Sequence, residues 1–187
     1  MDFQTLLTKR RSIRDFQSRQ VPLSLVKEIL QDSCLAPTAS NGQPCRFIIV
    51  QDRDCLKRLS EESKKNFLAN IQRNPDSPVK MYEAVLKDAN FNVFYNAPCA
   101  IFVIGPKKFK LLDADGALTI AYLMFSAAAR GLGTCWIALG SHLRDHEILN
   151  EIGMPEDCRI VAPVIIGYPA GIPPASERHA PAIVKII

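Results

Sequence analysis

The sequence predicts a layered domain in which helices pack on a β-sheet, either of the α+β class or doubly wound with parallel strands. Three observations favour this fold. Helical and strand-like segments alternate along the chain, several short apolar runs are rich in β-branched residues, and an alanine-rich apolar helix stands between two of these runs. The connections between the strands differ in length, so the sheet could be mixed, and the residue pattern leaves both classes open.

Local signals place the elements in the first half of the chain. Pro22 and Ser24 open a helix that stops at Ala36, because the residue before a proline avoids helical geometry. Asp54 is expected to cap the long helix that follows the first strand. The expected elements, in order, are a helix over residues 3–9, a helix over 22–36, a strand over 46–51, a helix over 54–70 and a helix over 79–89.

Glycine and proline mark the boundaries in the second half. Gly131 and Gly133 follow the alanine-rich helix directly, which indicates a helix stop and a close approach of the backbone to a neighbour. Pro163 suggests that its strand lies at an edge of the sheet or carries a bulge. The expected elements are a strand over 99–105, a helix over 113–130, a strand over 135–139, a short helix capped by Ser141 or Asp145 and ending at 152, a strand over 158–168 and a strand-like end over 182–187.

Composition and charge exclude several classes of protein. Of the 187 residues, 48% are hydrophobic and 22% charged, which is typical of a globular chain and not of a disordered one. A net charge of +4 is too weak to indicate a nucleic-acid binder, and no apolar run approaches the ~20 residues of a membrane span. The N-terminus has no signal-peptide pattern, so we expect one cytoplasmic domain over residues 1–187, with the polar region 60–95 as a candidate mobile flap.

No side-chain catalyst stands out. The six cysteines show no C-x-x-C spacing, and several lie in apolar runs, so we assign them to packing as free thiols. His142 and His146 lack the glutamate of an H-E-x-x-H metal site, and none of the three histidines, His179 included, has an obvious nucleophile partner. Neither a dinucleotide fingerprint nor a P-loop is present. An enzyme with this sequence must therefore take its chemistry from a cofactor.

A cluster of cations near the N-terminus has three interpretations. Arginine offers forked donors that match phosphate oxygens, and Ser12 adds a hydroxyl, so the cluster could clamp a phosphate. The second interpretation is a solvated basic turn without a ligand, and the third is a patch that binds nucleic acid. The cluster consists of Lys9, Arg10, Arg11, Arg14 and Arg19.

A polar loop precedes the first strand. Within PTASNGQP, Asn41 and Gln43 offer both donors and acceptors, which is what binding the edge of a heterocycle requires. Serine, asparagine and glycine are also common turn formers for local reasons, so a plain turn remains the alternative.

Taken in order, these segments resemble the FMN-dependent nitroreductase family. RRSIRDF (10–16) looks like the family's Arg-x-Ser-x-Arg/Lys flavin-phosphate motif, and APTASNGQPCRFIIV (36–50) is similar to its Pro-Ser-Ser-x-Asn-x-Gln-Pro-Trp loop and strand. NAPCAIFVIG, DADGALTIAYLMFSAAARGLGTCWI and PEDCRIVAPVIIGYPA resemble its strand, central helix and late strand. SERHAP (176–181) resembles its closing Lys-x-Arg-x-x-Pro segment.

The resemblance implies an α+β fold, namely a three-layer α-β-α sandwich with a central mixed, mainly antiparallel sheet. It also implies a homodimer with FMN between the subunits, electrons from NADH or NADPH, a small-molecule acceptor such as a nitroaromatic or quinone, and a C-terminal arm, 180–187, exchanged between subunits. The site residues that it implies are Arg10, Arg11, Ser12 and Arg14 at the phosphate and ribityl chain, Arg178 at the same phosphate, Pro37, Thr38, Ala39, Ser40, Asn41 and Gln43 along the flavin, and Ala138 and Leu139 with backbone amides towards the ring.

The chain departs from the family pattern at several positions. Ser176 stands where a lysine is frequent, Cys45 replaces the frequent tryptophan, and Ala121 and Tyr122 occupy the places of a common polar pair. These departures concern the substrate more than the flavin. The rival functions are a reductive dehalogenase or flavin-cleaving enzyme on the same scaffold, a non-enzymatic flavin-binding redox sensor, and a nucleic-acid binder.

Overall fold

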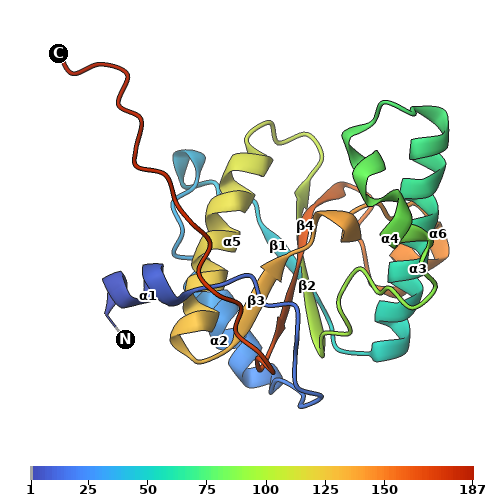
Figure 1. Ribbon diagram of the computed structural model, residues 1–187, viewed down its shortest axis with the longest axis horizontal. Helices are drawn as coiled ribbons and strands as arrows, with labels where there is room; N and C mark the ends of the chain where they lie inside the picture. Colours follow the sequence, from blue (N-terminus) through green and yellow to red (C-terminus); the bar gives the residue numbers. More distant parts are fainter. Residues whose placement is uncertain (1) are drawn as a thin grey trace.

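The computed structural model describes residues 2–187 and contains a four-stranded antiparallel sheet with helices on both of its faces (Figure 1). The helices are α1 (Phe3–Lys9), α2 (Leu23–Ser33), α3 (Arg53–Arg73), α4 (Glu83–Lys87), α5 (Leu112–Ala129) and α6 (His146–Glu151). The strands are β1 (Arg46–Val50), β2 (Cys99–Pro106), β3 (Gly133–Trp136) and β4 (Cys158–Gly167). Short 3₁₀ turns cover Ala39–Asn41, Pro78–Tyr82 and Ala138–Gly140.

The order of the strands decides between the two fold classes. The order is β1-β2-β4-β3, and each neighbouring pair is antiparallel. The α+β class is therefore confirmed, and the doubly wound parallel alternative is wrong. A parallel contact occurs at the outer edge of β3, where an isolated bridge joins Ser12 to Thr134.

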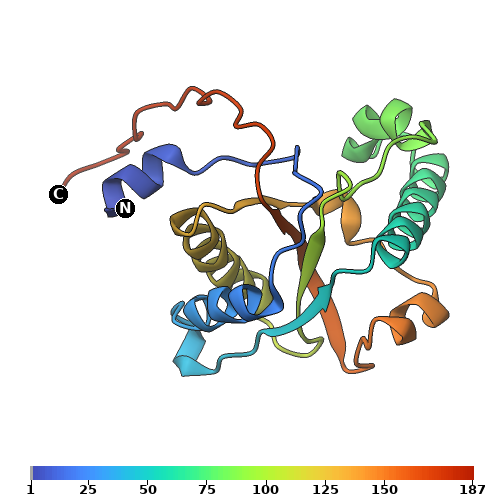
Figure 2. The ribbon, with the colours of Figure 1, turned by 90° about the horizontal axis from the view of Figure 1, so that it is seen from below.

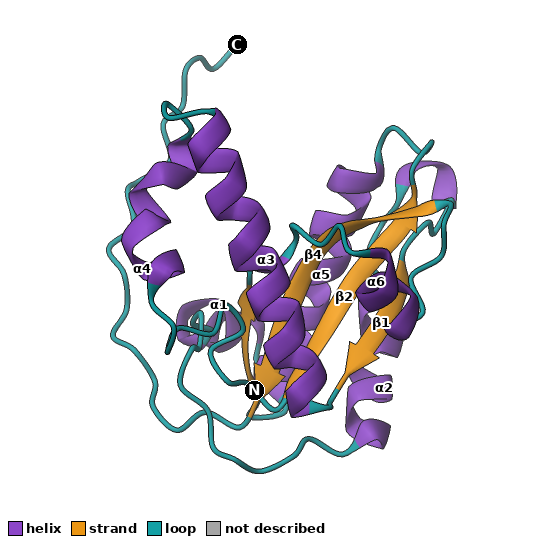
Figure 3. Ribbon diagram, turned by 90° about the vertical axis from the view of Figure 1, so that its right-hand side faces the viewer, coloured by secondary structure: helices purple, strands orange, loops and turns teal. Residues whose placement is uncertain are grey.

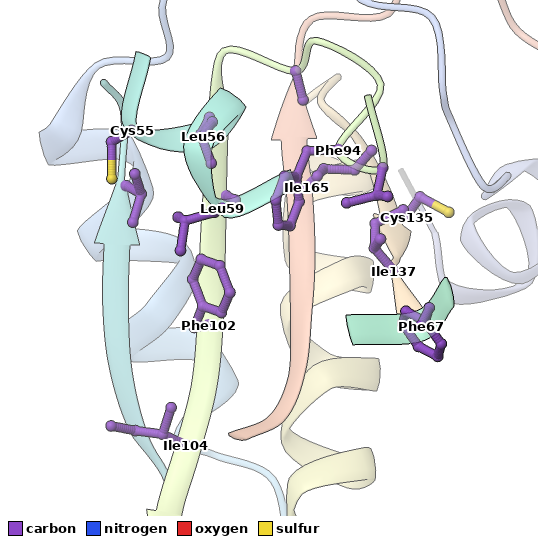
Figure 4. Close-up of a cluster of buried hydrophobic side chains, with 14 of the residues drawn as sticks. Cys55, Leu56, Leu59, Phe67, Phe94, Phe102, Ile104, Cys135, Ile137 and Ile165 are labelled. Atoms are coloured by element: carbon purple, nitrogen blue, oxygen red, sulfur yellow. The ribbon is translucent and has the colours of Figure 1, made fainter. Parts of the chain in front are cut away.

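Alternating side chains of the strands build a core on each face of the sheet. In β2, Ile101 and Val103 face α2 and α5, where Ile29 and Leu123 are fully buried. The opposite face of the sheet packs against α3. Figure 2 shows the sheet between the layer of α2 and α5 and the layer that contains α3. Figure 4 shows that second core, which includes Leu56, Leu59, Phe94, Phe102 and Ile165. The molecule is thus built in three layers, as the resemblance implied.

Two predictions about helices need correction. Asp52, not Asp54, caps α3: its backbone is extended and its carboxylate accepts from the Cys55 N–H at 2.6 Å, whereas Asp54 already lies in the first turn. The helix expected over 79–89 divides into a 3₁₀ turn and the short α4. Helix α4 ends at Lys87 because the backbone of Asp88 is extended, and the Asp88 carbonyl accepts from the ammonium group of Lys64 at 2.9 Å.

Two predictions about strands also need correction in part. The strand expected over 135–139 begins at Gly133 and ends at Trp136, which leaves residues 138–140 in a 3₁₀ turn. Pro163 lies in the interior strand β4, so the edge alternative is wrong, whereas the bulge alternative is confirmed: Val103 pairs with Ala162 but Ile104 pairs with Ile160. A proline has no N–H to donate to a neighbouring strand. It is tolerated here because the pairing of β3 with β4 ends at Trp136 and Val164, one residue before Pro163 is reached.

The C-terminal segment forms no strand within the chain. Residues 170–187 are exposed, and in Figure 1 this tail leaves the rest of the molecule. A strand needs a neighbour for its backbone hydrogen bonds, and none of the described strands pairs with residues 182–187. The strand predicted there is therefore wrong for the isolated chain.

Within residues 2–187, no helix combines the length and the apolar character that crossing a membrane requires.

Candidate functional site

The arginine-rich segment after α1 is extended and lies along the edge of β3. The Ile13 N–H donates to the Thr134 carbonyl at 3.0 Å, and the Ile13 side chain is buried. Gly133 permits this approach, since a Cβ there would stand 2.6 Å from the Ile13 side chain. The predicted close approach at Gly133 is thereby confirmed.

Alternation along this extended segment places three of the predicted phosphate ligands on one side. Because Ile13 points into the core, its neighbours Ser12 and Arg14 point the other way, and Arg10 follows the same two-residue period. These three residues act on the thiol of Cys135 in β3. Burial raises the pKa of this thiol, while Arg14, a hydrogen bond from Ser12, and Arg10 act to lower it. We call Arg10, Ser12 and Arg14 the clamp.

Arg11 makes its own bonds within the segment, although it lines a cavity together with Arg10. One guanidinium nitrogen donates to the carbonyl oxygens of Thr8 at 2.6 Å and Arg10 at 2.9 Å, and Nε is buried without a partner among residues 2–187. Arg19 lies elsewhere, with its guanidinium 4.1 Å from the centre of the Tyr168 ring. Arg178 lies in the exposed tail and makes no contact with the clamp among residues 2–187.

The polar loop 37–43 has an unusual backbone. Ser40, Asn41 and Gln43 have φ values of 50°, 52° and 44°, a left-handed conformation that residues other than glycine seldom adopt. The Gln43 N–H donates to Thr38 Oγ1 at 3.1 Å, and the Gln43 amide donates to Asn41 Oδ1 at 3.1 Å. The loop is thus held in one conformation, with the side chains of Ser40, Asn41 and Gln43 exposed.

The carboxylate of Asp115, in the first turn of α5, binds the backbone of the loop 37–43. Both oxygens of this buried carboxylate accept from the Ala39 N–H at 3.2 Å, and its residue is only 4% exposed. The sequence did not single out Asp115; a carboxylate in the first turn of an otherwise apolar helix was the available signal.

Replacing Asp115 by alanine is expected to lower the free energy of unfolding by about 1–3 kcal/mol, because the substitution leaves the Ala39 N–H without its acceptor. Asp113→Ala is the matched control. Asp113 lies two positions away on α5 and pairs with Arg159 through bonds of 2.7 Å at the surface, where an ion pair contributes ~0–1 kcal/mol. Urea unfolding of both variants measures the difference; equal losses would contradict a holding role for Asp115.

The turn Ala138–Gly140 follows β3 and is packed tightly. A Cβ on Gly140 would stand 2.6 Å from the Phe94 ring and 2.9 Å from Pro163, so the backbone lies directly on the core. The Leu139 carbonyl accepts from Ser63 Oγ of α3 at 2.6 Å. The N–H groups of Ala138 and Leu139 have no hydrogen-bond acceptor among the described residues. Two backbone donors are therefore free to bind a ligand.

The clamp and the loop lie at opposite ends of α5. Asp115, near the start of the helix, binds the loop, whereas Ala128, near its end, lines a cavity of about 200 Å³ together with Arg10, Arg11 and Gly133. At a rise of ~1.5 Å per residue, roughly 20 Å of helix separates Asp115 from Ala128. One chain therefore brings the clamp close to β3 but does not bring it to the loop.

The remaining polar candidates show no catalytic arrangement. Burial raises the pKa of the Cys99 thiol to about 12, as expected for a cysteine that packs in the core. His142 stacks on Phe67 with ring centres 4.0 Å apart, and burial lowers its pKa. In the described part of the chain, no group of three or more His, Cys, Asp or Glu residues could hold a metal ion.

Comparison with known proteins adds to this geometry. The sequence profile of the Nitroreductase family matches residues 7–168. The NADH dehydrogenase of Thermus thermophilus is 27% identical over 91% of this chain and 88% of its own, and the iodotyrosine deiodinase of Thermotoga neapolitana is 24% identical over 93% and 92%. Among solved structures, a nitroreductase from Bacteroides fragilis with bound FMN has a TM-score of 0.82 at 23% identity, covering 100% of this chain and 99% of that one. The fold of that protein is shared.

Proposed function

Because this chain belongs to the nitroreductase family, we propose that it is an FMN-dependent oxidoreductase that passes electrons from NADH or NADPH to a nitroaromatic, a quinone or a similar flat acceptor. The observation that carries the proposal is the extended segment beside β3: Ile13 is buried, so the alternation of side chains directs Arg10, Ser12 and Arg14 to the other side. This donor set suits a phosphate group, because arginine binds phosphate oxygens through charge-assisted, forked hydrogen bonds.

The chain offers groups for both ends of FMN. Arg10, Ser12 and Arg14 would hold the phosphate and ribityl chain, and Arg178 would reach the same phosphate from the tail. The free N–H groups of Ala138 and Leu139 would donate to acceptors on the ring. When bound, FMN supplies the two-electron chemistry, which no side chain in this site offers.

A homodimer would complete the site. The loop 37–43 lies about 20 Å of helix away from the clamp in one chain, so we propose that the loop of one subunit lines the flavin held by the clamp of the other. Exposed apolar side chains support an interface along α5 and α1. They are Phe3, Leu7, Leu111, Leu118 and Tyr122. Surfaces of this kind mark contacts between proteins.

An acceptor panel tests the proposed activity. With FMN bound, oxidation of NADH or NADPH should depend on a nitroaromatic or a quinone, and the kinetics should be ping-pong, since nicotinamide and acceptor would occupy the same flavin face in turn. Slow turnover with every acceptor despite bound FMN would instead favour a flavin-binding redox sensor.

The Thermotoga relative supports a second candidate, reductive dehalogenation. Adding a halogenated phenol to the panel, with and without oxygen, separates the two activities. Halide release with the phenol and no turnover of nitroaromatic or quinone would favour the second.

A further inference from the structure

Helix α3 carries a group of buried polar side chains that the proposed function does not use. Figure 3 shows α3 lying across the strands on one face of the sheet. Buried polar groups need hydrogen-bond partners, and these side chains find theirs on backbone groups of two loops. The group comprises Ser60, Glu62, Ser63, Lys64 and Asn66, the first four buried and Asn66 half-buried.

One part of this group binds the segment before β2. Ser60 Oγ accepts from the Val93 N–H at 3.0 Å, and Lys64 Nζ donates to the carbonyl oxygens of Asp88 at 2.9 Å and Phe91 at 3.1 Å. These bonds hold residues 88–93 against α3.

The other part binds the segment after β3. Ser63 Oγ donates to the Leu139 carbonyl at 2.6 Å, and Asn66, one turn further along α3, donates to the His142 carbonyl at 2.8 Å. Ser63 is completely buried, so water does not offer its hydroxyl an alternative partner. The two bonds fasten residues 139–142 to the same helix.

The bond from Ser63, together with the bonds that Ser141 makes, fixes the backbone on both sides of Leu139. The peptide plane that contains the Leu139 N–H also contains the Ala138 carbonyl, which accepts from the N–H of Ser141 at 3.3 Å and from its hydroxyl at 2.8 Å. The next plane contains the Leu139 carbonyl, which Ser63 binds. Since both planes beside the Leu139 Cα are held, its φ and ψ angles are held as well.

We propose that Ser63 is a positioning residue for electron transfer, because its hydroxyl orients the Ala138–Gly140 turn whose free N–H groups meet the flavin ring. The inference rests on the proposed function. Ser63 itself touches no reacting atom. It acts through the turn, and donors that are held in place before the reaction are worth more than donors that must be ordered during it.

The test compares Ser63→Ala with Ser60→Ala. Both serines are completely buried on α3, and each makes one recorded bond to a loop backbone, so their removal should cost similar stability. In the flavin-free protein, hydrogen exchange of the bonded Gly140 and Ser141 amides should accelerate in Ser63→Ala and stay at the wild-type rate in Ser60→Ala. Ser63→Thr, which keeps a hydroxyl, should restore slow exchange.

The loaded enzyme gives the second readout. Reduction of bound FMN by the nicotinamide should slow by about 10- to 100-fold in Ser63→Ala, with KM for the nicotinamide unchanged, because a small misplacement of positioning groups has effects of this size. Equal exchange or equal reduction rates in the two alanine variants would overturn the proposal alone. A wild-type protein that takes up no FMN would overturn the proposed function as well, and the two failures are thus distinguishable.

Discussion

Replacing Arg10 or Arg14 by alanine is expected to weaken FMN binding by about 10- to 150-fold for each substitution. A hydrogen bond to a charged group contributes ~1.5–3 kcal/mol, which corresponds to that range of affinity. Arg178→Ala should have a similar effect if the tail reaches the same phosphate. Fluorescence titration of the flavin-free protein with FMN measures the dissociation constant of each variant.

Arg19→Ala is the control for this series. Arg19 stacks on Tyr168 outside the clamp, yet its removal changes the net charge by the same amount. A non-specific effect of charge would weaken binding equally in Arg19→Ala. Unchanged FMN retention in Arg10→Ala, Arg14→Ala and Arg178→Ala would restore the interpretation of this segment as a solvated basic turn.

Deleting residues 180–187 is expected to give monomeric or insoluble protein. The deleted segment ends in AIVKII, and Ile183, Val184, Ile186 and Ile187 are exposed in the isolated chain. Burying an aliphatic side chain contributes ~1.5–3 kcal/mol, so four such groups seated on a second subunit would change the dimer dissociation constant by several orders of magnitude. Light scattering measures the mass in solution.

Substitutions within the tail separate the apolar contribution from chain length. Val184→Ser together with Ile186→Ser should shift the dimer towards monomer, whereas Lys185→Ser, the residue between them, should not. A stable dimer after the full truncation would show that the arm is dispensable for association.

Local sequence signals predicted most elements of the fold. The burial of β2 on both faces follows from its unbroken apolar run, and Gly153 after α6, with φ of 72°, stands where a helix stop was expected. Strand order was not predictable, because it depends on contacts between distant segments. Pro163 illustrates the limit: the expected bulge lies close to it, but the proline stands in an interior strand, just beyond the last pair that β4 makes with β3.

In the candidate site, too, local sequence signals predicted some features, whereas others depend on contacts between distant segments. The motif at residues 10–16 indicated the clamp, but separating Arg11 from its neighbours required knowing that the segment is extended, since only then do alternate residues share a side. Asp115 and Ser63 act through bonds to residues 76 positions away in the chain, Ala39 and Leu139 respectively. No local pattern carries such a signal.

Anaerobic titration of the purified, FMN-reconstituted protein with NADH and, separately, NADPH tests the proposed electron transfer. We expect non-covalent binding of FMN, loss of its yellow colour with at least one nicotinamide, and return of the colour when a nitroaromatic or quinone is added. Failure to bind FMN after reconstitution would contradict the proposed function, and bound FMN that neither nicotinamide reduces would contradict the proposed electron donor.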